Sequence, residues 1–203
     1  MANKNHELDN GIIQSAMQEF MEYGYEKASL RKIAASANVT VGAIYTRYKT
    51  KDFLFLSMVE PLLFRIEETF ESLKREYYSS SVQSEDFFKT IVKEAEMILH
   101  LLFDDYDRAV LLFCKSRGSS LEHYFDIIVE SKIDETIEFF ENQNLPQIDP
   151  TILKVLITAQ FHMIYQIINE GVDLEEARKI MNVAMTYNVG GWFAVLNSNK
   201  KEK

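Results

Sequence analysis

The sequence contains few of the residues that interrupt regular structure. Its 203 residues include only 7 glycines and 3 prolines. A β-sandwich or barrel needs many turns, and an α/β protein needs glycine-rich loops, so both fold classes are disfavoured. The single cysteine, Cys114, excludes an internal disulfide framework and suits a reducing compartment. Hydrophobic residues make up 47% of the chain, which is ample for a packed core.

Targeting and membrane segments are missing as well. Residues 1–10 are polar, with no apolar stretch behind a basic start, so no signal peptide is predicted. No uncharged apolar run reaches the roughly 18–20 residues that a membrane-spanning helix needs. The longest candidate, residues 155–169, contains Gln160, His162 and Gln166 and is interpreted as a buried helix. We therefore expect a cytoplasmic protein with no membrane partner.

Basic residues are in the minority, with 22 Lys and Arg against 31 Asp and Glu and a net charge of −9. That total argues against a general nucleic-acid binder. The charge is uneven, however: it is −3 over residues 1–27, +5 over residues 28–51 and −11 over residues 52–203. Surface charges are screened beyond about 8–10 Å at physiological salt, so a local basic segment can still attract phosphate. The acid-free window is either such a segment or a chance gap in acids.

Apolar residues recur at spacings of three and four along almost the whole chain, whereas the alternation typical of strands is scarce. We predict an all-α fold of about nine helices. Gly24 is expected to end the first helix, and Ser29 and Thr40 to cap the next two. The expected helices span about residues 13–23, 29–37, 40–48, 51–78, 84–104, 107–116, 119–142, 151–170 and 174–196.

Two of these expected helices carry local signals of their own. Pro61 should kink or split the fourth. Residues 119–122 resemble a capping box and should begin the seventh.

Residues 29–48 have the form of a helix-turn-helix, with a tight turn at Asn38-Val39 between two short helices. The second helix begins with the small residues Val41-Gly42-Ala43, which let its backbone approach the floor of a major groove. Tyr45, Lys49 and Lys51 follow near its end, where phenolic OH and ammonium groups can reach phosphates. An ordinary three-helix subdomain is the alternative.

Residues 16–34 and 39–54 resemble the two halves of the DNA-binding domain of the TetR (tetracycline-repressor-like) family. The second half has the family's aliphatic–tyrosine pair, Ile44-Tyr45, and its Lys-x-Lys segment followed by an acid, Lys49 to Asp52. The motif covers about 45 residues, and the rest of the chain matches in helical architecture and length alone. Tyr48 replaces the family's usual Phe, and Arg47 its common His, Tyr or Asn.

The resemblance implies a DNA-binding domain over residues 1–51 and a ligand-binding and dimerisation domain over residues 52–203. It implies a ligand-responsive transcriptional regulator, acting as a repressor, that binds a pseudo-palindromic double-stranded DNA operator as a homodimer and is released by a small-molecule effector. Tyr45 and Lys51 would hold phosphates, and Arg47 would reach a guanine edge or a phosphate. The expected DNA-binding residues are Arg31, Lys32, Thr40, Val41, Gly42, Ala43, Tyr45, Arg47, Lys49 and Lys51.

The last two expected helices are apolar on every face, and a helix that is apolar all round must be buried all round. One face on the chain's own core and the other on a second copy is the economical arrangement, although a thick monomeric core is the alternative. Gly190-Gly191 would permit close approach of another helix. The expected dimer-interface residues are Ile157, Phe161, Ile164, Ile168, Met185, Val189, Gly190, Trp192 and Phe193.

The middle helices offer soft apolar groups with a few polar ones, a mixture that suits a small-molecule cavity. The acidity of residues 52–203 favours a cationic ligand or is simply a solvated surface. The expected ligand-binding residues are Met97, His100, Phe103, Phe113, Cys114, Phe125, Gln160 and Tyr165.

Catalytic and metal-binding patterns are weak, so we expect no enzyme activity, no metal and no cofactor. Glu96 and His100 lie four residues apart, whereas carboxylate helix bundles use Glu-x-x-His pairs from two helices. Cys114 has no zinc-ligand spacing around it, and no glycine-rich phosphate loop is present. Two rival hypotheses are a DNA-binding regulator controlled by a protein partner, with a filled C-terminal core, and a helical-bundle enzyme.

Overall fold

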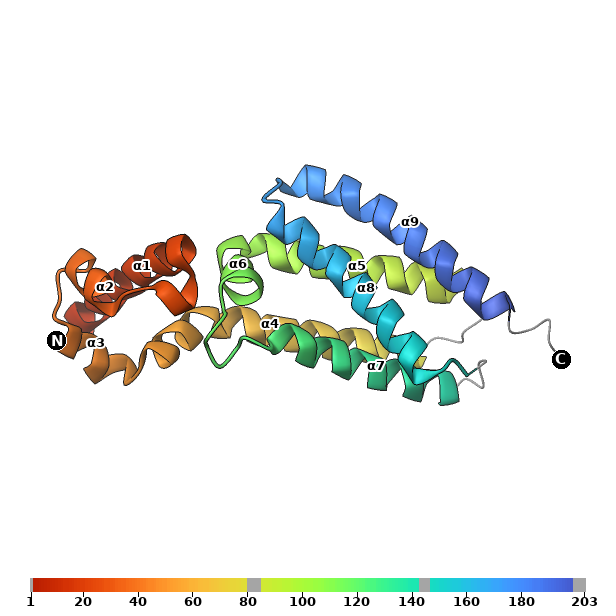
Figure 1. Ribbon diagram of the computed structural model, residues 1–203, viewed down its shortest axis with the longest axis horizontal. Coiled ribbons are helices and arrows are strands. Elements are labelled where there is room, and N and C mark those ends of the chain that lie inside the picture. Colours follow the sequence, from red (N-terminus) through yellow and green to blue (C-terminus); the bar gives the residue numbers. More distant parts are fainter. Residues whose placement is uncertain (1, 80–84, 143–146, 199–203) are drawn as a thin grey trace. The chain divides into compact units, whose positions relative to one another are not determined.

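The computed structural model describes residues 2–79, 85–142 and 147–198, and these residues form nine helices and no strand (Figure 1). The predicted all-α fold is confirmed. In chain order the helices are α1 (Ala2–Lys27), α2 (Leu30–Ser36), α3 (Val41–Tyr48), α4 (Lys51–Ser79), α5 (Glu85–Asp104), α6 (Tyr106–Cys114), α7 (Tyr124–Asn142), α8 (Pro150–Asn169) and α9 (Leu174–Ser198).

The chain divides into two compact units. The first runs to Phe64 and includes residues 105–124, so it holds α1 to α3, the start of α4, and α6. The second consists of residues 65–104 and the chain from Phe125 onward, and holds the rest of α4 with α5, α7, α8 and α9. Helix α4 thus contributes to both units. The functional division at residues 51 and 52 stays a prediction.

Local backbone signals set the ends of the N-terminal helices. Gly24 interrupts α1 with φ 71°, a left-handed conformation that favours glycine. Asn38 adopts φ 53° in the turn after α2, and asparagine tolerates this region better than most residues. Thr40 caps α3, because its Oγ1 accepts a hydrogen bond from the Ala43 N–H at 3.1 Å. Ser29 occupies the N-cap position of α2, but its side chain makes no capping hydrogen bond.

The structure differs from the predicted helix boundaries at three places. Helix α1 begins at Ala2 and not near residue 13. Of the predicted kink or split at Pro61, the split is wrong. Pro61 lies inside one continuous α4 and does not split it, because proline costs a helix one hydrogen bond while the neighbouring Met58 and Leu62 are fully buried. The seventh helix begins at Tyr124 and not at residue 119. The capping-box residues close a turn instead. Ser119 Oγ donates to the Ser116 carbonyl at 2.6 Å, and the Glu122 carboxylate accepts from the Gly118 N–H.

Each unit has its own apolar core. In the first unit, Phe20 and Phe55 are fully buried, and their rings meet edge to face at 5.2 Å between centroids. Tyr25 packs its ring edge-on against Phe55 at the same distance. The second core is aromatic and aliphatic, and its buried members are Val129, Ile133, Phe139, Phe140, Leu153, Ile157, Phe161 and Trp192.

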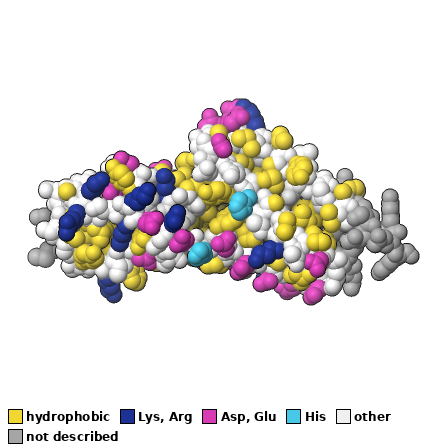
Figure 2. Space-filling model, viewed as in Figure 1, with side chains coloured by type: hydrophobic (Ala, Val, Ile, Leu, Met, Phe, Trp, Pro, Cys, Tyr) yellow, Lys and Arg dark blue, Asp and Glu magenta, His cyan; other side chains and the backbone are white. Residues whose placement is uncertain are grey.

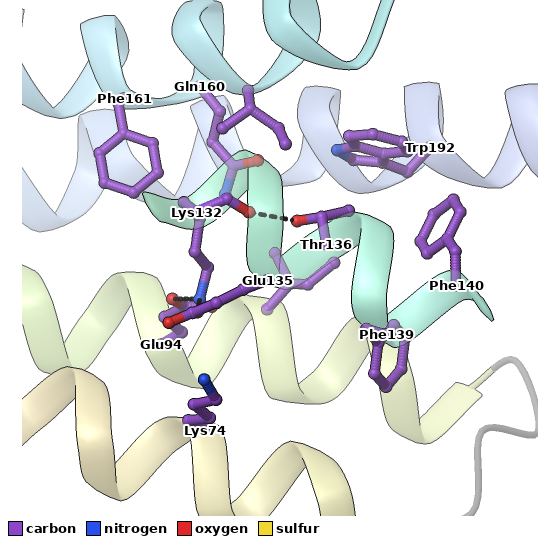
Figure 3. A pocket seen from close by; sticks show the side chains of 12 residues that line it. Lys74, Glu94, Lys132, Glu135, Thr136, Phe139, Phe140, Gln160, Phe161 and Trp192 are labelled. Carbon is purple, nitrogen blue, oxygen red and sulfur yellow. Dashed lines mark hydrogen bonds and ion pairs between the residues drawn. The ribbon is translucent and has the colours of Figure 1, made fainter. Parts of the chain in front are cut away.

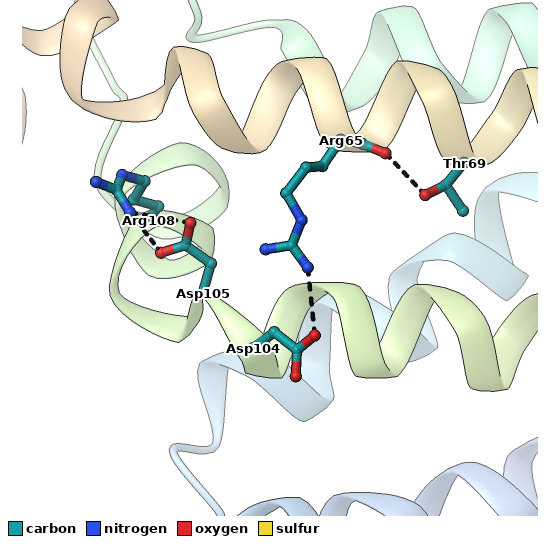
Figure 4. A network of polar contacts seen from close by, with 5 residues as sticks. All are labelled: Arg65, Thr69, Asp104, Asp105 and Arg108. Atoms are coloured by element: carbon teal, nitrogen blue, oxygen red, sulfur yellow. Dashed lines mark hydrogen bonds and ion pairs between the residues drawn. The ribbon is translucent and has the colours of Figure 1, made fainter.

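Polar contacts fasten helices within each unit (Figure 4). In the first unit, Arg108 of α6 donates from Nε to the Met58 carbonyl of α4 at 2.5 Å and from Nη1 to both carboxylate oxygens of Asp105. In the second unit, Arg65 of α4 donates to Asp104 of α5 at 3.3 Å. These contacts fix α6 on the start of α4 and α5 on its continuation.

Candidate nucleic-acid interface and ligand pocket

Helices α2 and α3 form a helix-turn-helix in the first unit. The Val39 N–H donates to the Ala34 carbonyl at 2.9 Å and closes the turn. Ala34 and Ile44 are buried and pack the two helices into the unit. The other side of α3 is open: Gly42 is exposed, and Tyr45 is 50% exposed. The outward side of α3 is therefore available to a nucleic acid.

The cations of the basic window lie around these helices. The side chains of Arg31, Lys32 and Lys49 are exposed, and the Lys32 ammonium lies 4.2 Å from the centroid of the Tyr23 ring. In the view of Figure 2, Lys and Arg side chains are spread over the first unit. Exposed cations beside an open helix are what attraction to DNA phosphates requires.

Lys51 is less exposed than Arg31, Lys32 and Lys49. Its Nζ donates to the Glu26 carbonyl at 3.4 Å and lies 4.7 Å from the centroid of the Tyr25 ring. Burial lowers the pKa of Lys51 from the ordinary lysine value, while the nearby carboxylates of Glu19 and Glu26 act in the opposite direction. A phosphate bound by the Lys51 ammonium would therefore replace its contacts with the Glu26 carbonyl and the Tyr25 ring.

Arg47 is held inside the first unit. Its Nε donates to Asp9 Oδ1 at 2.6 Å, and the Arg47 side chain is 24% exposed. The contact joins α3 to α1. The structure gives Arg47 a packing role, and its expected contact with a guanine edge or phosphate stays a prediction.

We expect the Arg47–Asp9 pair to contribute modestly to stability, because both side chains are partly exposed to water. Urea unfolding of Arg47→Ala, Asp9→Ala and the double variant should give a coupling free energy of about 0.5–1 kcal/mol. If Arg47 acts on DNA binding only through its pair with Asp9, the two single variants should weaken DNA binding equally, by no more than about threefold. A much larger loss for Arg47→Ala than for Asp9→Ala would show that Arg47 contacts DNA itself.

Sequence reasoning missed Glu19 of α1. This carboxylate is 9% exposed, and its Oε1 accepts a hydrogen bond from the Ser29 N–H at 2.9 Å. It thereby secures the start of α2, where the Ser29 side chain makes no cap. The signal was weak: Glu19 lies three residues after Ala16 and next to Phe20 on the apolar stripe, an unusual position for an acid.

The predicted ligand-binding residues fall in different places. Phe113 and Cys114 belong to the first unit, and the other six belong to the second. Met97 and His100 line an open groove on α4 and α5. The rings of Phe125, Phe161 and Tyr165 pack together. Of the eight residues, Gln160 alone lines the pocket described next.

The second unit contains a pocket of about 70 Å³ (Figure 3). One wall is charged: the Lys132 ammonium lies 2.7 Å from Glu94 Oε1 and 3.5 Å from Glu135 Oε2. Glu94 is only 4% exposed. Lys74 and Thr136 also contribute polar groups. The apolar lining consists of Ile91, Phe139, Phe140, Ile157, Phe161 and Trp192.

A signal for this pocket was present in the sequence. Lys132, Glu135, Thr136 and Phe139 follow one another at helical spacing on α7 and share one face of that helix. Such a Lys–Glu pair is usually a solvated surface feature. In the structure the pair lines a pocket instead, because residues of α5 and α8 cover it.

Helices α8 and α9 each bury one face and expose another. Six of the predicted dimer-interface residues are buried within their own unit: Ile157, Phe161, Ile164, Ile168, Met185 and Trp192. Phe193, predicted too, is exposed, and Val183 and Tyr187 are 72% and 79% exposed. The remaining predicted residues, Val189, Gly190 and Phe193, are not buried, and their role in a dimer stays a prediction. The other exposed large apolar side chains of α8 and α9 are Ile152, Val155, Ile180, Val183 and Tyr187.

Helix α8 is long and apolar enough to cross a membrane by length and composition, but its Leu153, Ile157 and Ile164 are buried in the second unit. No group of three or more His, Cys, Asp or Glu side chains in the described part of the chain is arranged to hold a metal ion.

Comparison with known proteins places the first unit among bacterial regulators. Residues 12–58 match the model of the bacterial regulatory proteins of the tetR family. The chain is 25% identical over 189 residues to the fatty acid metabolism regulator protein of Bacillus subtilis, covering 93% of this chain and 84% of that protein. The matched segment contains the helix-turn-helix and the start of α4.

Solved structures share the fold of nearly the whole chain. NalD, the secondary repressor of the MexAB-OprM multidrug efflux pump in Pseudomonas aeruginosa, has a TM-score of 0.61 at 18% identity and covers 90% of this chain and 96% of its own. FadR of Bacillus subtilis, solved in complex with stearoyl-CoA, has a TM-score of 0.56 at 18% identity and covers 86% and 96%. Both likenesses concern the fold alone.

Proposed function

Because the chain belongs to the TetR family of transcriptional regulators, we propose that it is a homodimeric cytoplasmic repressor that releases its DNA operator when a small-molecule effector binds. Each protomer inserts α3 into a major groove of a pseudo-palindromic site. The relatives it matches are regulators and not enzymes.

The observation that carries the DNA-binding part is the construction of α3. The Thr40 cap and the buried Ile44 hold the helix, while Gly42 leaves one exposed position of its first turn without a side chain. A helix that enters a major groove reads base edges from its N-terminal residues. Exposed Arg31 and Lys32 in the first turn of α2, and Lys49 at the end of α3, would contact phosphates.

The homodimer is supported by the exposed apolar face of α8 and α9. Gly190 and Gly191 lie within α9, and a Cβ built on either would meet no atom within 4 Å. The protomer's own packing therefore does not require glycine, which costs about 1 kcal/mol relative to alanine within a helix. Close approach of a second copy explains both glycines and the exposed Val183 and Tyr187.

The pocket of the second unit is the proposed effector site. Its volume of about 70 Å³ is far below the roughly 300–1,000 Å³ of typical ligand sites. An effector would have to separate α7 from α5 and α8. It would therefore bind the state with the widened pocket more tightly, and this difference in affinity couples effector binding to release of DNA. The aromatic lining suits a ligand with a long apolar chain. FadR was solved with such a ligand, stearoyl-CoA, and the similar protein of Bacillus subtilis is named as a regulator of fatty acid metabolism.

Selection of binding sites from random DNA duplexes tests the proposal. We expect recovery of an inverted repeat whose half-sites lie about one helical turn, or a multiple of it, apart. Fluorescence anisotropy should then show binding that weakens steeply with salt, because bound counterions are released from the DNA. Recovery of no preferred sequence by the purified protein would overturn the proposal.

A further inference from the structure

We propose that the effector is an amphiphile with an anionic head group, and that the Lys74 ammonium binds this group at the pocket. The inference rests on the proposed function, because it takes the pocket to be the effector site. It adds the charge of the ligand and the residue that selects it.

Lys74 is the available cation of the pocket. It lies on α4 and lines the pocket, and within the part of the chain that the structure describes its side chain makes no ion pair or hydrogen bond. Figure 3 shows its ammonium directed toward the group formed by Glu94, Lys132 and Glu135. Lys132 is already engaged by both carboxylates. An anionic ligand would thus find one uncommitted ammonium.

A cationic head group fits this wall poorly. It would have to compete with Lys132 for Glu94, a carboxylate with only 4% of its surface exposed. Removing one partner from a buried ion pair leaves the other charge uncompensated, which is costly. An anion on Lys74 leaves the Glu94–Lys132 pair intact. The half-buried position of Lys74 also keeps its ammonium accessible to an entering ligand.

The apolar chain of the ligand would lie against the aromatic side of the pocket. Phe140 and Trp192 meet there with ring centroids 6.4 Å apart and nearly perpendicular planes. Ile157 and Phe161 continue the apolar lining from α8. Trp192 is the only tryptophan of the sequence. Its fluorescence therefore reports directly on occupation of the pocket.

The experiment titrates the full-length protein with four probes, each below its solubility limit or critical micelle concentration, and follows Trp192 emission. Palmitate and palmitoyl-CoA are anionic, hexadecanol is neutral and hexadecylamine is cationic at neutral pH. We expect Lys74→Met to weaken binding of an anionic probe about tenfold, as expected for loss of a charge-assisted hydrogen bond. Binding of hexadecanol should change by less than about twofold. Lys154→Met, an exposed lysine of α8 outside the pocket, is the matched control.

The outcomes separate the ligand assignment from the proposed function. Weakening of palmitate binding by Lys74→Met supports a carboxylate head group, and weakening of palmitoyl-CoA alone supports the CoA phosphates as the anion. Equal affinity of native and Lys74→Met protein for both anionic probes overturns the role of Lys74. Tighter binding of hexadecylamine than of the anionic probes also overturns it, as does an unchanged Trp192 emission with all four probes. Failure of a bound anion to release operator DNA would contradict the proposed function and leave the head-group assignment intact.

Discussion

Replacing Gly42 by glutamate is expected to abolish operator binding while leaving the first unit folded. A Cβ at Gly42 would lie 3.7 Å from Thr40 Oγ1, an ordinary contact, and the position is exposed. A carboxylate in the first turn of a helix is favourable to the helix dipole, and glutamate has a higher helix propensity than glycine. Facing DNA, the same carboxylate is repelled by phosphates, and unfavourable charge pairs at an interface cost several kcal/mol.

We therefore expect Gly42→Glu to lower operator affinity at least about 100-fold and to leave the melting temperature unchanged or higher. Anisotropy with the selected operator and thermal unfolding measure the two effects. Gly42→Gln has nearly the same shape without the charge, and it should retain at least about ten times more affinity than Gly42→Glu. Native affinity in the glutamate variant would mean that the first turn of α3 does not face DNA.

Replacing Val183 by aspartate is expected to convert the dimer to monomers. Val183 is 72% exposed in the protomer, so a charge there costs the folded chain little. In a dimer built on the apolar face of α8 and α9, the same charge would be buried without a partner, which association cannot tolerate. A dimer that binds both half-sites has an affinity about 10²–10⁴-fold higher than a monomer that binds one, so operator affinity should also fall by at least 100-fold.

Sedimentation equilibrium gives the mass of the variant, and anisotropy its operator affinity. Ile127→Asp is the matched control, because Ile127 of α7 is also an exposed apolar residue, at 59%, and lies outside α8 and α9. The control should stay dimeric. A Val183→Asp protein that remains dimeric, with full operator affinity, would place the dimer interface elsewhere.

The helix-turn-helix was predictable in detail because its signals are local. Thr40 caps α3 through its own side chain, and Gly24 and Asn38 take the left-handed conformations that their residue types favour. The tie between Arg47 and Asp9 joins residues 38 positions apart and was not predictable. Such a pair depends on how α1 packs against α3, and no local sequence pattern predicts that packing.

The same difference runs through the second unit. Periodicity predicted α5, α8 and α9 closely, yet the expected ligand-binding residues do not gather in one pocket. Lys132 and Glu135 follow each other on α7 like a surface pair. Their role changes because Glu94 of α5 lies 2.7 Å from the Lys132 ammonium and α8 covers the site.

The amino-acid sequence by itself determined the all-α class, the place of the helix-turn-helix and the family resemblance, because helix periodicity, caps and the basic window act over a few neighbouring residues. Only the tertiary structure decided which faces of α8 and α9 are buried, leaving Ile157 and Trp192 inside and Val183 and Tyr187 outside. The physical reason is that a helix apolar on every side carries no pattern that distinguishes its own core from a partner. That choice is made by packing against helices distant in the chain.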